Sequence, residues 1–397
     1  MGKKYVFCYN DDMKFTNSKN GLALTGILFS LCLTSCGIKP IPKSVEFSLN
    51  GPTEKVKVHT DFQLEMINSN NILQYVMDNN HLFGSEENSY PKPAQLNWTT
   101  ESDTGRKVDE YIIQVSETED FLSADEYYSS SEAVEVYNLL PNTKYYWRVH
   151  ARYKTTIFTS MDSTFETANF SLRNIAAPLV INMRDLGDNS HMKMGLIYRS
   201  GQFNYDSNKY GALVSTPSEK GLWVLKQQLG IKTEIDLRKT LSSSFSYDEV
   251  VGITSSPLGE EVNYISTPME YSNKNIFTND SNKEAIRNFF DALANENNYP
   301  VVFHCVRGTD RTGALAYVLK ALCGCSREEL YLDYFFSNYS LIGTPVGELP
   351  FTSENFYDSQ INATEGATLK DKTINYLINN VGVSSTTLDK IISILAK

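Results

Sequence analysis

Apolar and polar residues alternate with a period of two along the middle of the chain. One run places Tyr111, Ile113 and Val115 on one side of a strand, and residues 145–151 repeat the pattern. Successive side chains of a strand point to opposite faces of a sheet, so this alternation predicts short strands with one buried face. We therefore expect an all-β domain over residues 91–168.

In the C-terminal half the pattern changes to helices followed by short apolar runs. Helices are predicted around residues 222–229 and 286–293, and each precedes an apolar strand, at 231–237 and 301–303. Alternation of helices and strands is typical of a parallel β-sheet flanked by helices. We expect an α/β domain over residues 171–397, the largest in the chain.

The N-terminus has the layout of an export signal. Lys14 and Lys19 give a short basic region, an apolar stretch follows at residues 22–33, and the run ends in Leu-Thr-Ser-Cys at Cys36. The apolar stretch is shorter than a helix needs to cross a bilayer. The last four residues resemble the lipobox of bacterial lipoproteins, which implies that residues 1–36 are a signal segment and that Cys36 is lipidated.

This resemblance implies an exported protein, anchored through Cys36 to the bacterial cell envelope on its periplasmic side or at the cell surface. An uncleaved apolar anchor or a signal without lipid would also fit the pattern. Residues 37–90 are rich in Asn and Ser and show few regular patterns. We expect a tether or N-terminal extension there.

Charge and composition narrow the function. The 397 residues carry a net charge of -11 with no long run of Lys or Arg, which argues against nucleic acid as a partner. Of six Cys, only Cys305, Cys323 and Cys325 follow Cys36, and three thiols make no disulfide framework. None of the five His stands at a metal-ligand spacing from Cys or acidic residues, so we expect neither a metal nor another cofactor.

Two features of the all-β domain indicate its type. Trp98 lies on an early strand, and Tyr145 ends the run Leu-Leu-Pro-Asn-Thr-Lys-Tyr that begins at Leu139. These residues resemble the fibronectin type III domain, a β-sandwich whose tyrosine corner carries a Leu-x-Pro-x-Thr-x-Tyr run. The resemblance implies that Trp98 and Tyr145 belong to the core between two sheets, and that the domain is a spacer without catalytic residues.

The segment from Val301 to Gly313 carries the chemistry. It is an apolar strand that runs through a Gly-containing loop into a helix, with the sequence His-Cys-Val-Arg-Gly-Thr-Asp-Arg-Thr-Gly from position 304. Backbone N–H groups between Val306 and Arg311 can point at one anion, at the positive end of the helix dipole. The same field favours the ionised, nucleophilic form of Cys305. The planar fork of Arg311 can bind two phosphate oxygens.

Other residues of the segment support this interpretation. Gly308 permits a tight turn, Thr312 can donate its hydroxyl to the sulfur, and Gly313 lets the helix pack closely. His304 is expected to orient the loop through hydrogen bonds. The expected phosphate-binding residues are those of the loop and the helix start: Val306, Arg307, Gly308, Thr309 and Thr312.

The run resembles the loop of the Cys-x5-Arg protein tyrosine phosphatase superfamily, and residues 171–397 resemble bacterial tyrosine phosphatases with a Lys-Asp-Arg loop. Further similarity lies at residues 182–187 and 195–201. The resemblance implies hydrolysis of phosphate monoesters, most directly phosphotyrosine on proteins, through a phosphocysteine on Cys305. Thr309 stands where the family commonly has Lys, a residue implicated in handling phosphoinositides. The resemblance therefore implies activity on lipid phosphates less strongly than activity on phosphotyrosine.

Two carboxylates are candidates for the general acid that protonates the leaving oxygen. The family's Lys-Asp-Arg pattern implies this role for Asp310, which could otherwise only favour the helix start. Asp236 ends a predicted strand and would face the same crevice, unless it pairs with Arg238 or Arg184. Asp310 is the first choice because it lies in the loop itself.

Further charged residues are expected to be structural, with Arg184, Asp185 and Arg199 pinning the first loop of the α/β domain and Asp333 anchoring a helix face. Alternatives for the function stay open: an inositol phosphate or phosphoinositide phosphatase, or a catalytically silent surface module that binds phosphate. The intact Cys305 favours the enzyme, with a phosphorylated protein or a small phosphate monoester as partner. No sequence feature sets the oligomeric state.

Overall fold

The computed structural model of the chain describes residues 39–79, 89–203, 217–241, 249–251, 253–270, 276–277, 279–340 and 357–397. These residues form two compact units. Among the described residues, the β unit comprises residues 39–54 together with Gln95–Glu135 and Lys144–Glu166, and the α/β unit comprises the rest. The predicted signal segment and Cys36 lie outside the described residues. Among the described residues, no helix has both the length and the apolar character needed to span a membrane.

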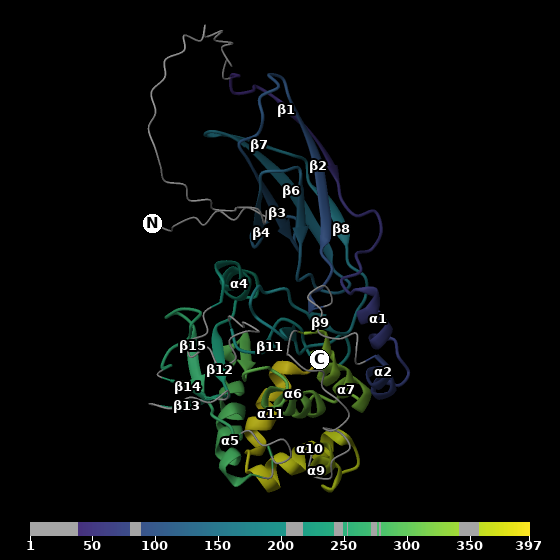
Figure 1. The fold of residues 1–397 in the computed structure, drawn as a ribbon, viewed down its shortest axis with the longest axis vertical. Coiled ribbons are helices and arrows are strands. Elements are labelled where there is room, and N and C mark those ends of the chain that lie inside the picture. The colour runs from purple at the N-terminus through teal and green to yellow at the C-terminus, as the bar shows by residue number, and fades with distance from the viewer. Residues whose placement is uncertain are drawn as a thin grey trace, which may run out of the picture. The chain divides into compact units, whose positions relative to one another are not determined.

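The β unit is a sandwich of two sheets (Figure 1). One sheet has the order β1-β2-β5, and the other has the order β4-β3-β6-β7 with β8 also paired to β6. Its strands are β1 (Val45–Asn50), β2 (Ala94–Ser102), β3 (Glu110–Ser116), β4 (Asp125–Ser129), β5 (Ala133–Val136), β6 (Lys144–Tyr153), β7 (Thr156–Thr159) and β8 (Ser163–Glu166).

The period-two pattern of the sequence matches the burial of these strands. Tyr111 and the other odd-numbered apolar residues of β3 are buried, and every second residue of β6 is buried between half-buried or exposed neighbours. Trp98 meets the ring of Tyr111 edge-on at 5.2 Å, and Tyr145 stacks on Phe165 at 5.3 Å. The predicted sandwich core is therefore confirmed.

The α/β unit is built on a six-stranded sheet in the order β15-β12-β16-β11-β10-β9. The four strands from β15 to β11 are parallel, whereas β10 runs antiparallel to β11 and β9 antiparallel to β10. The parallel sheet is confirmed for these strands, and the two antiparallel strands at its edge are too short to leave a pattern in the sequence. The bounds are β9 (Arg173–Asn174), β10 (Arg184–Asp185), β11 (Ile197–Ser200), β12 (Thr233–Asp236), β15 (Asn263–Ser266) and β16 (Val301–His304).

Helices cover both faces of this sheet, because alternate residues of its strands face opposite sides. Val301 and Phe303 pack into a core cluster with helices α5, α6 and α11, whereas Val302 packs into a second cluster with α4 and η2. The predicted helix at 222–229 is a short α-helix that continues as a π-helix. The bounds are α4 (Glu219–Trp223), η2 (Val224–Gln228), α5 (Asp280–Leu293), α6 (Arg311–Leu322) and α11 (Ser385–Leu395).

The remaining elements of the α/β unit are shorter. They are the parallel pair β13 (Lys239–Leu241) and β14 (Glu249–Val251), and the helices η3 (Glu296–Asn298), α7 (Arg327–Phe335), η4 (Phe336–Tyr339), α9 (Tyr357–Asn362), α10 (Leu369–Tyr376) and η5 (Leu377–Val381). Of these, α7 matters most for the site, since it packs against α6 and carries Asp333.

The segment expected as a tether over residues 37–90 contains regular structure instead. Its first part is β1 of the β unit, and its second part forms α1 (Asp61–Ile67) and α2 (Ile72–Asn79) of the α/β unit. The two helices pack on α7 and η4, where Tyr339 donates its hydroxyl to the Phe62 carbonyl at 2.8 Å. Helices of two turns bury too few apolar residues to show a clear period, which explains why the sequence did not predict them.

Candidate active site

The loop of residues 305–310 lies at the carboxyl end of a central parallel strand. β16 pairs with β11 on one side and β12 on the other, and it ends at His304, directly before Cys305. The loop leads into α6, whose 12 residues are all buried. The positive end of this helix dipole therefore faces the loop, in the crevice where open α/β sheets bind ligands.

Gly308 is required by the packing of this loop. Its φ of +73° lies in the left-handed region, which glycine adopts far more readily than other residues. A Cβ at this position would lie 2.4 Å from the carbonyl oxygen of Ser200 and 2.6 Å from the N of Gly201. The loop therefore packs directly on the end of β11, and the left-handed conformation of Gly308 fits the tight turn expected there.

Hydrogen bonds hold the carbonyl groups of the loop on its outer side. Gln202 donates its backbone N–H to the Val306 carbonyl at 2.9 Å, and Asn182 Nδ2 donates to the Arg307 carbonyl at 3.0 Å. Arg199 donates to the Gly308 carbonyl. In a trans peptide the C=O and the next N–H point in opposite directions. The N–H groups that follow these three carbonyls therefore point to the inner side of the loop.

The inner side of the loop carries the polar groups that an anion needs. Within the described residues, the backbone N–H groups of Gly308 and Thr309 donate to no other group. The hydroxyls of Thr309 and Thr312 are buried and have no hydrogen-bond partner among the residues that the structure describes. Buried donors of this kind are normally satisfied, so the loop has the chemistry of a cradle for an oxyanion.

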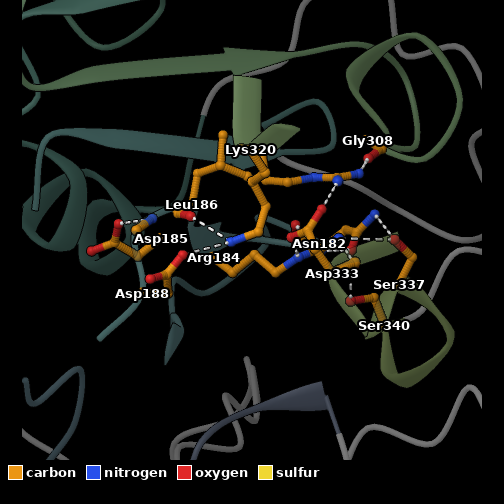
Figure 2. A network of polar contacts seen from close by, with 12 residues as sticks. Asn182, Arg184, Asp185, Leu186, Asp188, Gly308, Lys320, Asp333, Ser337 and Ser340 are labelled. Atoms are coloured by element: carbon orange, nitrogen blue, oxygen red, sulfur yellow. Dashed lines mark hydrogen bonds and ion pairs between the residues drawn. The ribbon is translucent and has the colours of Figure 1, made fainter. Parts of the chain in front are cut away.

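A buried ion network fixes the outer side of the loop (Figure 2). Arg199 donates Nη2 to the Gly308 carbonyl at 2.5 Å and pairs through Nη1 with Asp333. Arg184 donates Nε to Asp333 Oδ1 at 2.8 Å and Nη2 to the Asp333 carbonyl at 2.6 Å. Asp333 thus connects both arginines to α7, as the structural role predicted for them requires.

The charges of this network stabilise one another. Burial alone would raise the pKa of Asp333, but Arg184, Arg199 and Lys320 lower it and prevail, so its pKa falls from 3.8 to about 2. A second pair, Arg173 Nη1 to Asp185 Oδ2 at 3.1 Å, fixes the start of the β10 region. Asp333 is therefore ionised at neutral pH, where it can hold both arginines.

His304 and Asp236 form a second buried group beneath the loop. His304 Nδ1 lies 3.2 Å from the Cys305 carbonyl, and Nε2 lies 2.9 Å from Glu234 Oε1. These contacts fit the orienting role predicted for His304. Glu234, fully buried on β12, is a partner that the sequence did not reveal, because a single Glu within a strand has no distinctive spacing.

Asp236 has the surroundings of a structural carboxylate. It is fully buried, its oxygens accept hydrogen bonds from Arg238 Nε and Nη2, and Tyr264 donates its hydroxyl at 3.1 Å. Burial by itself would raise the pKa of Asp236, but the lowering by Arg238 and His304 is larger. The pKa of Asp236 therefore lies well below its usual range. A general acid must be protonated before it can act, so these surroundings favour the alternative of a salt bridge with Arg238.

The structure places the other predicted residues in and beside the loop. Cys305 is 3% exposed, and Arg311 donates Nη1 to the carbonyls of Leu237 and Met269, both at 3.3 Å. Asp310 is partly exposed and sits at the N-cap position of α6, but its side chain makes no capping hydrogen bond. Helix capping therefore does not account for that carboxylate.

Two groups of metal-ligand side chains lie close together, although their spacing in the sequence did not indicate it. Within the described residues, three ligand atoms come within 4.8 Å of one another in each group, namely Asp188, His191 and Cys325 in one and Glu234, Asp236 and His304 in the other. The members of each group are brought together by the fold, so sequence spacing could not reveal them. In the second group the ligand atoms already bind Arg238 and one another.

Comparisons with known proteins agree with the two units. Residues 175–396 match the model of a family described as the tyrosine phosphatase family, and residues 84–162 match the fibronectin type III domain. The first match covers more than half of the chain. No curated protein matches the chain.

Solved structures show weak likenesses to each unit. The sixth fibronectin type III domain of human fibronectin type III domain containing protein 3 is 28% identical, over 20% of this chain and 76% of that one, with a TM-score of 0.19. The core catalytic domain of the PP-IP phosphatase Siw14 from S. cerevisiae, in complex with citrate, is 18% identical over 38% and 77%, with a TM-score of 0.26. A second structure of the Siw14 catalytic core is 18% identical over 37% and 82%, with a TM-score of 0.23.

Proposed function

This chain belongs to the tyrosine phosphatase family and is a phosphatase, and we propose that it hydrolyses phosphotyrosine on proteins through a phosphocysteine on Cys305. One observation carries the proposal. The carbonyls of Val306, Arg307 and Gly308 are hydrogen-bonded on the outer side of the loop, so the following N–H groups converge on its inner side. A phosphate bound there lies beside Cys305, at the N-terminus of α6.

In the first step the loop N–H groups and the guanidinium of Arg311 bind the phosphate oxygens. The Cys305 thiolate attacks phosphorus, an S–P bond forms, and the P–O bond to the leaving group breaks. Asp310 gives its proton to the leaving oxygen, so the phenol departs neutral and Asp310 becomes a carboxylate. Charge on the transferring phosphoryl oxygens is stabilised by donors already in place.

In the second step water attacks the phosphocysteine. The Asp310 carboxylate takes a proton from the water, a P–O bond forms, and the S–P bond breaks. Inorganic phosphate leaves, Cys305 returns as a thiolate, and Asp310 is protonated again. Cys305, Asp310 and water account for every proton transferred and every bond formed or broken in this cycle.

The charge of the loop supports this substrate class. Thr309 is neutral and buried, so the position where the family commonly has Lys adds no positive charge. Arg307 is partly exposed at the rim. One phosphate monoester, on a protein or a small molecule, matches this charge better than a head group with several phosphates.

The test is phosphate release by the full chain from matched peptides carrying phosphotyrosine or phosphoserine and from a phosphoinositide, with Cys305→Ser as the blank. Phosphotyrosine is expected to give the highest kcat/KM. A preference for phosphoserine or the phosphoinositide would overturn the substrate assignment but not the chemistry. If nothing is released from any substrate while phosphate still binds, the protein is a binding module.

The two candidate acids can be separated by leaving-group dependence. Asp310→Asn is expected to lower kcat/KM about 10²- to 10⁴-fold for phosphotyrosine, the usual contribution of general acid catalysis. It should lower kcat/KM far less for an aryl phosphate whose leaving group is acidic and needs no proton. The measurement is the ratio of kcat/KM for the two substrates, because kcat/KM covers only the steps up to the phosphocysteine and excludes the later step in which Asp310 acts as base.

Asp236→Asn is the matched control, since it makes the same change in a fully buried carboxylate. It leaves Arg238 buried with its pair lost, so we expect a less stable protein with an unchanged ratio of the two kcat/KM values. If the ratio changes in Asp236→Asn and not in Asp310→Asn, the assignment of the acid is wrong.

A further inference from the structure

Three different metal-ligating side chains converge away from the phosphate loop. Asp188 and His191 lie between β10 and β11, and Cys325 lies between α6 and α7. Their ligand atoms all come within 4.8 Å of one another. Glu329, on α7, brings a second carboxylate to the same place, with Oε1 3.4 Å from His191 Nδ1.

The distances fit a common centre. Cys325 Sγ lies 3.2 Å from Asp188 Oδ2, and His191 Nδ1 lies 3.9 Å from Asp188 Oδ1. In a tetrahedral zinc site the bonds are about 2.0–2.3 Å, which separates neighbouring ligand atoms by roughly 3.3–3.7 Å. Cys325 Sγ and Asp188 Oδ2 are already close to this separation, whereas the other pairs of ligand atoms lie within 4.8 Å and would have to approach by up to about 1 Å.

His191 provides an independent observation. Its Nδ1 atom is buried and has no hydrogen-bond partner among the residues that the structure describes. Two carboxylates lie nearby without bonding to it, at 3.4 and 3.9 Å. A nitrogen placed in this way can give its lone pair to a cation at the centre of the group.

The charges at the group balance when a divalent cation is added. Asp188 pairs with Lys320 at 3.2 Å, and it also accepts three backbone N–H groups. With Cys325 as a thiolate, the two carboxylates and the thiolate carry three negative charges and Lys320 one positive charge. A cation of charge +2, bound with release of the Cys325 proton, leaves the group without net charge.

A cavity of about 20 Å³ borders the group on one side. It is lined by Asp188, Lys320 and Glu329 among others, but not by His191 or Cys325, so it has room for roughly one water molecule beside the group and not at its centre. The Cys325 thiol donates to Asp188 Oδ2 at 3.2 Å.

We propose that Asp188, His191 and Cys325 bind a structural Zn²⁺ ion, with Glu329 as the fourth ligand. Zinc accepts this mixture of sulfur, nitrogen and oxygen ligands. Binding breaks the S–H bond of Cys325, forms a Zn–S bond and releases the proton to solvent. The ion joins the β10–β11 loop to α7, and it takes no part in the proposed phosphatase reaction.

The test uses the full chain carrying Cys305→Ser, so that the loop thiol cannot bind the metal. Zinc is expected to bind with one equivalent and to raise Tm by about 5 °C or more at a hundred times Kd. Cobalt in its place should give a thiolate-to-cobalt charge-transfer band. Cys325→Ser should abolish that band and weaken zinc binding at least about tenfold, whereas Cys323→Ser, a buried thiol outside the group, should change neither.

His191→Gln provides a second test, because the His191 side chain is 35% exposed and its replacement should not prevent folding. It is expected to weaken zinc binding at least about tenfold as well. The proposal is wrong if zinc does not raise Tm of the parent, or if Cys325→Ser or His191→Gln binds zinc as tightly as the parent. Neither outcome depends on phosphatase activity.

Discussion

Replacement of Cys305 by Ser is expected to reduce phosphate release from every substrate at least about a thousandfold, while phosphate still binds. The hydroxyl keeps the size of the side chain but is not ionised at neutral pH, so the S–P bond that carries the first step cannot form. Loss of a nucleophile normally removes most of the catalytic rate and leaves the binding groups in place. Single-turnover assays and isothermal titration with inorganic phosphate measure the two effects separately.

Cys323→Ser is the control for this variant. Cys323 is also a buried thiol, but it caps the far end of α6. Its replacement should leave kcat within a factor of about two, since small changes away from a site rarely alter its chemistry. Turnover that persists in Cys305→Ser would exclude a phosphocysteine and reassign the loop to phosphate binding alone.

The predicted phosphate loop shows which parts of a site a sequence can reveal. Cys305, Gly308 and Arg311 are contiguous with a strand and a helix, so the local geometry follows from their order. The period-two strands and the parallel central strands were likewise predictable, because each is a local pattern. The short helices α1 and α2 were not, since two turns hold too few apolar residues.

The partners that fix the loop were less visible. Asn182, Arg199 and Asp333 are separated by more than a hundred residues from the groups they bind in the loop or network. A sequence shows that such residues carry charge or an amide, but not which of them meet. Asp236 illustrates this limit, since its pairing with Arg238 rather than Arg184 is settled only by the folded arrangement.

The ion network explains why a loop of this kind can hold its N–H groups inward. A bound phosphate would stabilise that arrangement, but before binding the N–H groups repel one another at the helix terminus. Arg199 and Asn182 offset this by binding the carbonyls on the outer side. Preorganised donors of this kind need no rearrangement as charge develops in the reaction.

Asp333→Asn tests this account and is expected to have the largest effect on stability. It leaves Arg184 and Arg199 buried with their shared carboxylate removed, and breaking a buried pair in this way costs about 3–5 kcal/mol of unfolding free energy. The Gly308 carbonyl is then held less firmly, so kcat/KM should also fall. Urea unfolding followed by helical circular dichroism measures the loss, because the described helices all belong to the α/β unit.

The pH dependence identifies the carboxylate as the cause. The pKa of Asp333 is lowered to about 2 in the folded protein, so its contribution is present above the unfolded value near 3.8 and is lost as the pH falls through the folded one. The stability difference between wild type and Asp333→Asn should therefore shrink from about pH 4 to pH 2. Glu328→Gln, an exposed change on the same helix, should stay within about 0.5 kcal/mol of wild type. A difference that is constant over this range would mean that packing, and not the buried charge, is what Asp333 supplies.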